Sequence, residues 1–196
     1  MSKRLLVACE ESQIVTMAFR NLGYEAFSCD IQDCTGGFPE FHIKDDVLKH
    51  LDDGWDMMIG FPPCTYLSTC QSQLIYLPGH VIRDEERYRK MEEASQFFYK
   101  LWDSDIPRIC LENPRSLKAA NLPVEYSQYI EPFFFGDSYR KRTRLFLKNL
   151  PPLMFTCLCE PEYSKWSKYS DSVNRSKFHY GVAKAMAEQW SVFLND

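Results

Sequence analysis

The sequence predicts an α/β fold built on a mostly parallel sheet with helices on both faces. Short apolar runs alternate along the chain with segments whose apolar residues recur at helical spacing, and this alternation is typical of doubly wound parallel sheets. Two of the runs lead directly into proline, which ends a strand because it lacks the backbone donor that a sheet needs. The 196 residues suffice for one full-sized core, so we expect residues 1–196 to form a single domain.

The first part of the chain supplies four of the predicted strands. Residues 4–10 are an apolar run suited to a buried strand. Residues 12–24 follow with the spacing of an amphipathic helix, with Ser12 as its N-cap and Gly23 at its end. The next elements are strands at 25–31, at the start of 41–51 before a helical turn, and at 55–61.

The second part begins with a charged amphipathic helix over residues 83–103, whose apolar positions recur at helical spacing. Residues 70–82, just before it, are predicted to be a long loop and a candidate lid. The remaining elements are strands at 107–114, 129–136 and 143–152 and a final helix at 179–194.

The charge distribution is uneven. The chain has a formal net charge of −4, yet residues 138–184 carry 10 Lys and Arg against 3 Asp and Glu, a net charge of +7. A basic segment with interspersed aromatics is a candidate nucleic-acid surface, because the cations can face phosphates and the rings can stack on unpaired bases. A solvated basic rim around an ordinary core is the alternative. The aromatics are Tyr139, Phe155, Tyr163, Trp166, Tyr169 and Phe178.

The eight cysteines do not predict a disulfide framework or a metal site. No early segment has the layout of a secretory signal, and no stretch reaches the roughly 20 apolar residues of a membrane span. Neither Cys64 with Cys70 nor Cys157 with Cys159 has the CxxC spacing of a zinc site. We therefore expect a cytoplasmic protein with reduced thiols and no bound metal.

Three strand ends carry candidate reactive residues. The stretch GFPPCTYLS, residues 60–68, presents Cys64 just beyond a strand that two prolines end, and LENP places Glu112 and Asn113 at the end of the next parallel strand. In RKRTRLFL, Arg142 and Arg144 alternate with a threonine and so point to one face of a strand. Open parallel sheets bind ligands at the carboxyl ends of their strands.

These stretches, in this order, resemble the motifs of the DNA (cytosine-5) methyltransferases. GFPPCTYLS is similar to the nucleophile motif, LENP to the Glu-Asn motif and RKRTRLFL to the paired-arginine motif. YGVAKAMAEQ, residues 180–189, is similar to the motif that closes the cofactor pocket, and residues 5–31 follow the spacing of the first cofactor-binding strand, helix and acidic strand end. The resemblance is closest to the compact phage and prophage members that lack a large target-recognition domain. It implies a Rossmann-like methyltransferase domain in the cytosol of a bacterium or phage-infected host.

The resemblance implies an order of chemical steps on cytosine. Cys64 adds as a thiolate to carbon 6, which makes carbon 5 nucleophilic toward the methyl group of S-adenosylmethionine. Glu112 handles the proton near ring nitrogen 3, provided that its pKa is raised. Asn113 fixes the surroundings of Glu112, while Arg142 and Arg144 hold the base, its carbonyl oxygen or a flanking phosphate.

The residues alone leave other roles open for each candidate. Cys64 could be a buried structural thiol, and Glu112 could cap a helix. Arg142 and Arg144 could form a salt-bridged surface.

S-adenosylmethionine is the cofactor that the resemblance implies. Its cationic sulfonium and amino group suit acidic strand ends: Glu10 and Glu11 after the first strand, Asp30 as the ribose ligand and Asp46 as the acceptor for the adenine amino group. The full set of implied cofactor contacts is Cys9, Glu10, Glu11, Asp30, Ile31, Asp46, Val47, Phe61, Pro62 and Gly181.

The chain departs from the family pattern in four places. The first loop, CEESQ, has no glycine for close approach to the cofactor. Thr65 follows the nucleophile and Arg140 begins the arginine motif, where the family has glutamine. Only the short basic segment 151–179 stands where a target-recognition domain is usual, so little is available to read base edges.

Three functions are therefore open. The first is a cytosine-5 DNA methyltransferase of relaxed or short specificity that reads phosphates through its basic segment. The second keeps the chemistry but acts on single-stranded nucleic acid or a cytosine mononucleotide, which need no base flipping. The third is a catalytically idle relative that binds nucleic acid or nucleotide.

Overall fold

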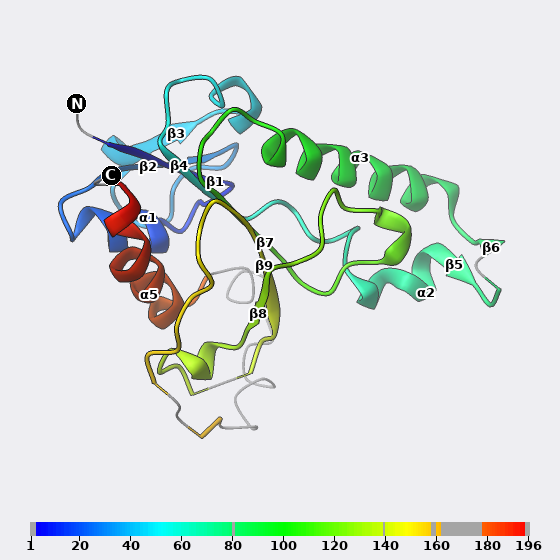
Figure 1. Cartoon of the computed structure of the whole chain (residues 1–196). Coiled ribbons are helices and arrows are strands. Elements are labelled where there is room, and N and C mark those ends of the chain that lie inside the picture. The colour runs from blue at the N-terminus through cyan, green and yellow to red at the C-terminus, as the bar shows by residue number, and fades with distance from the viewer. Residues whose placement is uncertain (1–2, 80, 139, 158–159, 162–177, 195–196) are drawn as a thin grey trace.

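A computed structural model describes residues 3–79, 81–138, 140–157, 160–161 and 178–194. Its main feature is a seven-stranded sheet in the order β3-β2-β1-β4-β7-β9-β8 (Figure 1). The strands are β1 (Arg4–Ala8), β2 (Glu25–Asp30), β3 (His42–Lys44), β4 (Met57–Gly60), β7 (Ile109–Asn113), β8 (Gln128–Ile130) and β9 (Thr143–Lys148).

The sheet confirms the predicted α/β class. The five strands from β3 to β7 are parallel, and β9 lies antiparallel between β7 and β8. The chain builds outward from β1 to β3 and then crosses back to β4, so the strand order reverses between β1 and β4. In open parallel sheets, the crevice at such a reversal is the usual ligand site.

Helices cover both faces of the sheet (Figure 1). On one face, α1 (Ile14–Arg20) and α5 (Tyr180–Trp190) share a core with the strands, and on the other face α3 (Glu85–Trp102) does the same. Both cores include residues of the central strands, because a strand between two helical layers is apolar on both sides. Single 3-10 turns occupy Pro39–Phe41, Val47–Lys49, Thr69–Gln71, Lys118–Ala120, Pro132–Phe134 and Ser191–Leu194.

The start of α1 differs from the prediction that Ser12 caps it. The residue before the helix is Gln13, which makes no side-chain capping bond. Instead the buried Glu10 accepts hydrogen bonds from the backbone amides of Val15 (2.6 Å) and Thr16 (3.2 Å) and from the Thr16 hydroxyl (2.7 Å). A carboxylate there suits the orphan amides of the helix start.

Burial of Glu10 makes the stability of the protein depend on pH. Burial raises its pKa from 4.5 to about 7, although its hydrogen bonds act in the opposite direction. Between about pH 5 and 7 the folded state therefore binds more protons than the unfolded state, so the free energy of unfolding falls as pH rises. We expect Glu10→Gln to remove a slope of roughly 1 kcal/mol per pH unit, measured by urea unfolding at several pH values. Glu40→Gln, which replaces an exposed carboxyl, is the control and should keep the wild-type slope.

Two predicted boundaries are corrected. Residues 70–82 are not a loop, since they contain a short helix, α2 (Ser72–Ile75), and a hairpin of β5 (Tyr76–Leu77) and β6 (Val81–Ile82). Ile75 and Tyr76 pack in a cluster with Met91 of α3, which gives this arm its own small core. The strand predicted at 129–136 ends at Ile130, because the chain turns into a 3-10 helix at the following proline.

No helix within the described ranges combines the length and hydropathy that crossing a bilayer requires.

Candidate active site

The strand ends of β4 and β7 bring Cys64 and Glu112 together. β4 ends at Gly60, and the two prolines that follow lead to Cys64, whose carbonyl accepts hydrogen bonds from the amides of Leu67 (3.1 Å) and Ser68 (3.0 Å). This turn holds the thiol half-buried at the carboxyl edge of the sheet. Glu112 lies near the end of the neighbouring parallel strand, β7, and its charge raises the pKa of the Cys64 thiol.

Glu112 is held by β9. In the antiparallel register Glu112 pairs with Leu145, so Thr143, two residues away, lies on the same face of the sheet. The Thr143 hydroxyl donates a hydrogen bond to Oε1 of Glu112. Burial raises the pKa of Glu112 above its usual range, and the Thr143 hydrogen bond and the Lys141 charge only partly oppose this effect. A raised pKa is the condition under which Glu112 could handle a proton, and the structure meets it.

The Cys64 thiol is not activated by its surroundings alone. Burial is the main cause of its raised pKa, the charge of Glu112 is the second, and the charge of Lys141 acts in the opposite direction. A protonated Glu112 beside a charged Lys141 is thus the state that most favours the thiolate.

Lys141, Thr143 and His179 join this site and were not predicted from the sequence. Burial and the Lys141 charge lower the pKa of His179 to about 3, so the imidazole is neutral. Burial also lowers the pKa of Lys141. The alternation in RKRTRLFL could have pointed to Lys141 and Thr143. If the arginines share one face of a strand, the lysine and the threonine share the other face.

The remaining motif residues lie on the opposite face of the sheet from Glu112. Arg144 pairs across the sheet with Asn113 and so lies on the opposite face of β9 from Thr143. Arg142 donates to Oε1 of the buried Glu131 (3.0 Å), and the buried Asn113 donates to Pro114 and Ser116. The two arginines do share one face, as predicted, but the structure does not bring them to Cys64 and Glu112.

The Lys141 charge gives a testable effect on Cys64. Lys141→Met keeps the length of the side chain and removes the cation, so the thiol pKa should rise and the thiolate fraction at neutral pH should fall roughly three- to tenfold. The measurement is the rate of Cys64 alkylation by iodoacetamide, followed by mass spectrometry of the Cys64 peptide. The exposed Lys118→Met is the matched control. An unchanged alkylation rate in Lys141→Met would contradict the assignment.

The predicted cofactor residues of the first three strands meet at one edge. The charges of Asp30 and Asp46 both contribute to the raised pKa of the Cys9 thiol, after burial, so the three side chains are close together. The Asp30 carboxylate accepts from the amide of Gln32 (2.9 Å) at the end of β2, and that of Asp46 from Leu48 (3.0 Å). Around them, Glu11 is partly exposed, Ile31 is exposed and Val47 is buried.

The glycine-free first loop still adopts conformations that favour glycine. Cys9 and Gln13 both have φ of 57°, a left-handed conformation that costs other residues roughly 1 kcal/mol. The side-chain amide of Gln13 holds the loop by donating to the carbonyl of Phe38 (2.8 Å) and accepting from its amide (3.1 Å). Gly36 packs against this loop, where a Cβ would lie 2.6 Å from the Ser12 carbonyl.

The last three predicted cofactor residues have structural partners. Phe61 packs on Phe178, with ring centroids 4.6 Å apart, and Pro62 is buried beside it. Gly181 lies against the backbone of Phe135 and donates to Asp137 (3.3 Å). The close contact with the Phe135 backbone is thus one reason for a glycine at position 181. A role of Gly181 in binding the cofactor stays a prediction.

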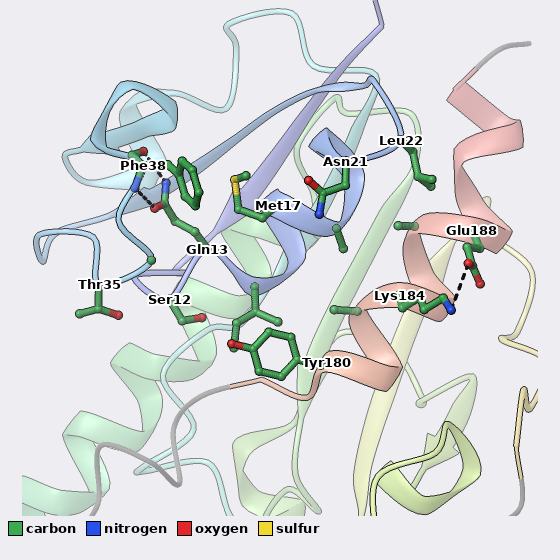
Figure 2. Close-up of a pocket in the computed structure, with 15 residues that line it drawn as sticks. Ser12, Gln13, Met17, Asn21, Leu22, Thr35, Phe38, Tyr180, Lys184 and Glu188 are labelled. Carbon is green, nitrogen blue, oxygen red and sulfur yellow. Dashed lines mark hydrogen bonds and ion pairs between the residues drawn. The ribbon is translucent and has the colours of Figure 1, made fainter.

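A cavity of about 610 Å³ lies elsewhere, between α1 and α5 (Figure 2). None of the predicted site residues lines it. Its walls include Met17 of α1, Leu22 just beyond that helix, Tyr180 and Lys184 of α5, and Phe38. This cavity is therefore separate from the Cys64–Glu112 pair.

The predicted basic segment 151–179 lies mostly outside the described residues. Four of the aromatics named for the basic stretch 138–184 also lie outside them: Tyr139, Tyr163, Trp166 and Tyr169. The same holds for Cys159, one of the cysteines whose spacing was compared with that of a zinc site.

No protein-family model matches the chain, and no curated protein matches its sequence. Solved structures do share its fold. One is described as a DNA modification methyltransferase encoded within an Escherichia coli prophage, with a TM-score of 0.50 and 15% identity over 86% of this chain. Another is the Entamoeba histolytica methyltransferase EhMeth, with a TM-score of 0.51 and 11% identity over 83% of this chain. The chain spans 55% and 58% of these two proteins. Its α/β sheet is thus the Rossmann-like fold of known methyltransferases.

Proposed function

We propose that this chain is an S-adenosylmethionine-dependent methyltransferase that modifies carbon 5 of cytosine in DNA through a covalent cysteine adduct. The observation that carries the proposal is the meeting of Cys64 and Glu112 at the carboxyl edge of adjacent strands, with the pKa of Glu112 raised by burial. A thiol beside a carboxyl of raised pKa is what nucleophilic addition to a pyrimidine needs.

The side chains have separate tasks in this reaction. The Cys64 thiolate forms a bond to carbon 6, and the electrons of the 5,6 double bond move toward carbon 5 and the ring. Glu112, whose pKa burial raises, donates a proton to ring nitrogen 3 as negative charge develops there. After carbon 5 is methylated, the proton on ring nitrogen 3 returns to the Glu112 carboxylate. The proton on carbon 5 then passes to water, and its bonding electrons re-form the 5,6 double bond and expel the Cys64 thiolate. The Thr143 hydroxyl orients the Glu112 carboxyl throughout.

The strand-end acids fit the cofactor that this reaction requires. When bound, S-adenosylmethionine would supply the methyl group. Asp30 would hold the ribose hydroxyls, Asp46 would accept from the adenine amino group, and Glu11 would face the cationic part of the molecule. The charges of Asp30 and Asp46 both act on the Cys9 thiol, so negative charge is concentrated around that residue. Such a concentration of negative charge favours a cationic ligand.

The substrate base must leave the stack to reach Cys64. Arg142 and Arg144 face away from Glu112, so of the roles expected for them a flanking phosphate fits better than the base itself. Single-stranded nucleic acid and a cytosine nucleotide are the alternative substrates for the same chemistry.

The test is covalent trapping on DNA that contains 5-fluorocytosine. Fluorine cannot leave after methylation of carbon 5, so the wild-type protein should form an adduct stable to denaturation when S-adenosylmethionine is present. Cys64→Ser should form none. Cys70→Ser, which replaces an exposed thiol six residues further along the chain, should react as the wild type does. Absence of an adduct on single-stranded and duplex DNA, with the protein folded and cofactor bound, would contradict the proposal.

A catalytically idle nucleotide-binding protein is the second candidate. The raised pKa of the Cys64 thiol favours it, because a protonated thiol is a poor nucleophile. Such a protein would bind S-adenosylmethionine in calorimetry, form no adduct and bind equally well as Cys64→Ser.

A further inference from the structure

Three arginines at the start of β9 each lie over an aromatic ring of the neighbouring segment. They alternate along the chain, and the rings come from β8 and its two flanks. The Cζ-to-centroid distances are 5.3 Å for Arg140 over Phe133, 4.9 Å for Arg142 over Tyr129 and 4.2 Å for Arg144 over Tyr126. We name these six residues the arginine–aromatic ladder.

The ladder lies on the outside of the molecule. β8 is the edge strand of the sheet (Figure 1). Tyr126 is 41% exposed and Tyr129 46%, and the Arg142 side chain is 64% exposed. Large aromatics are seldom left open to solvent in a row, and exposed clusters of them mark contact surfaces.

Two arginines of the ladder, Arg142 and Arg144, differ in whether a carboxylate neutralises their charge. Arg142 is paired with the buried Glu131. For Arg144, by contrast, no carboxylate of the described residues lies at salt-bridge distance, and its contact is the Tyr126 ring. Such a cation on a ring offers a flat, positively charged surface on which a base can stack or which a phosphate can approach.

The spacing of the ladder suits an unpaired strand. Residues two apart along an extended chain are about 6.6 Å apart, roughly twice the 3.4 Å between successive phosphates of one strand along a duplex. Bases that stack on separate rungs must therefore be pulled apart from one another, which a duplex does not allow. The ladder also begins beside the reactive edge, since Arg144 pairs with Asn113, the residue after Glu112.

We infer that the arginine–aromatic ladder is a binding track for single-stranded nucleic acid, which leads the strand to the edge where Cys64 and Glu112 lie. The inference rests on the proposed function for its choice of substrate and deepens it by naming the strand form. Stacking on rings is tolerant of sequence, so this track needs no element that reads base edges.

The test is fluorescence anisotropy with a labelled oligothymidine of about 12 nucleotides, a length within the range that such surfaces cover. The probe has no cytosine, so its binding does not depend on the reaction. Tyr126→Leu and Tyr129→Leu should each weaken binding of the single strand roughly tenfold, and should change binding of the same length of duplex about twofold or less. Thermal unfolding checks that both variants fold.

Two substitutions of Arg144 separate the contribution of stacking to binding from that of charge. Arg144→Gln should lower the slope of log affinity against log salt by about one. Arg144→Lys should restore that slope but not the affinity, because lysine keeps the charge and loses the planar stack. Arg89→Gln, on the exposed surface of α3, is the matched control and should match the wild type.

The outcomes distinguish this inference from the proposed function. If the folded tyrosine variants bind the single strand as the wild type does, or the wild type prefers duplex, the ladder is not a strand track, whatever the trapping experiment shows. If the variants lose binding but the wild type forms no adduct with 5-fluorocytosine DNA, the track stands and the proposed reaction is wrong.

Discussion

Glu112→Gln is expected to lower the rate of methyl transfer by roughly 10²- to 10⁴-fold, the usual contribution of a general acid. Glutamine has the same shape and can still accept the hydrogen bond that Thr143 donates to Glu112, but it has no proton to give to the pyrimidine ring. The measurement is single-turnover transfer of labelled methyl groups to cytosine-containing DNA. Because the effect is on the chemical step, substrate binding should change much less than the rate.

The pH dependence of the same reaction provides the control. In the wild type, the rate should fall as pH rises through the raised pKa of Glu112, because the carboxyl must be protonated to act. Glu112→Gln should lose this falling limb. Thr143→Val removes a hydrogen bond that lowers the pKa of Glu112, so it should move the limb to higher pH. A rate within about threefold of the wild type in Glu112→Gln would exclude Glu112 as the proton donor.

Gly181→Ala is expected to reduce the free energy of unfolding by about 3 kcal/mol, the upper part of the usual range for overpacking. A Cβ at this position would overlap the carbonyl oxygen of Phe135 and lie 3.0 Å from the Asp137 carboxylate. The carbonyl belongs to the backbone and cannot rotate away, so the start of α5 must shift. The gain of roughly 1 kcal/mol that alanine gives over glycine in a helix is smaller than this cost.

Urea unfolding measures the effect, with Tyr180→Ala as the control. Tyr180 precedes Gly181 in the same helix and is 74% exposed, so its replacement should change stability by about 0.5 kcal/mol or less. Equal stabilities of the two variants would show that the close approach at Gly181 costs little to relieve.

The meeting of Cys64 and Glu112 could be predicted because strand ends are local features. The apolar run before the two prolines places Cys64 just beyond β4, and the run before Pro114 places Glu112 near the end of β7. Parallel neighbours bring their carboxyl ends to one edge, so no knowledge of distant contacts was needed. The acidic ends of β2 and β3 followed in the same way, with Asp30 and Asp46 meeting near Cys9.

The face of β9 that meets Glu112 could not be predicted. The alternation in RKRTRLFL separates Arg142 and Arg144 from Lys141 and Thr143, but it is equally compatible with either set facing Glu112. The register of β9 against β7 decides between them, and it places Thr143 on the Glu112 face.

The sequence by itself determined the order of the seven strands of the main sheet and of the helices α1, α3 and α5, and the residues that stand at the strand ends, because apolar periodicity and proline act within a few residues. Only the tertiary structure decided that β9 lies antiparallel between β7 and β8, and that Glu10 rather than Ser12 caps α1. It also decided that Lys141 joins Cys64 and that the arginines stack on β8 and its flanks. These arrangements depend on contacts between segments far apart in the chain, whose burial and register no local pattern fixes.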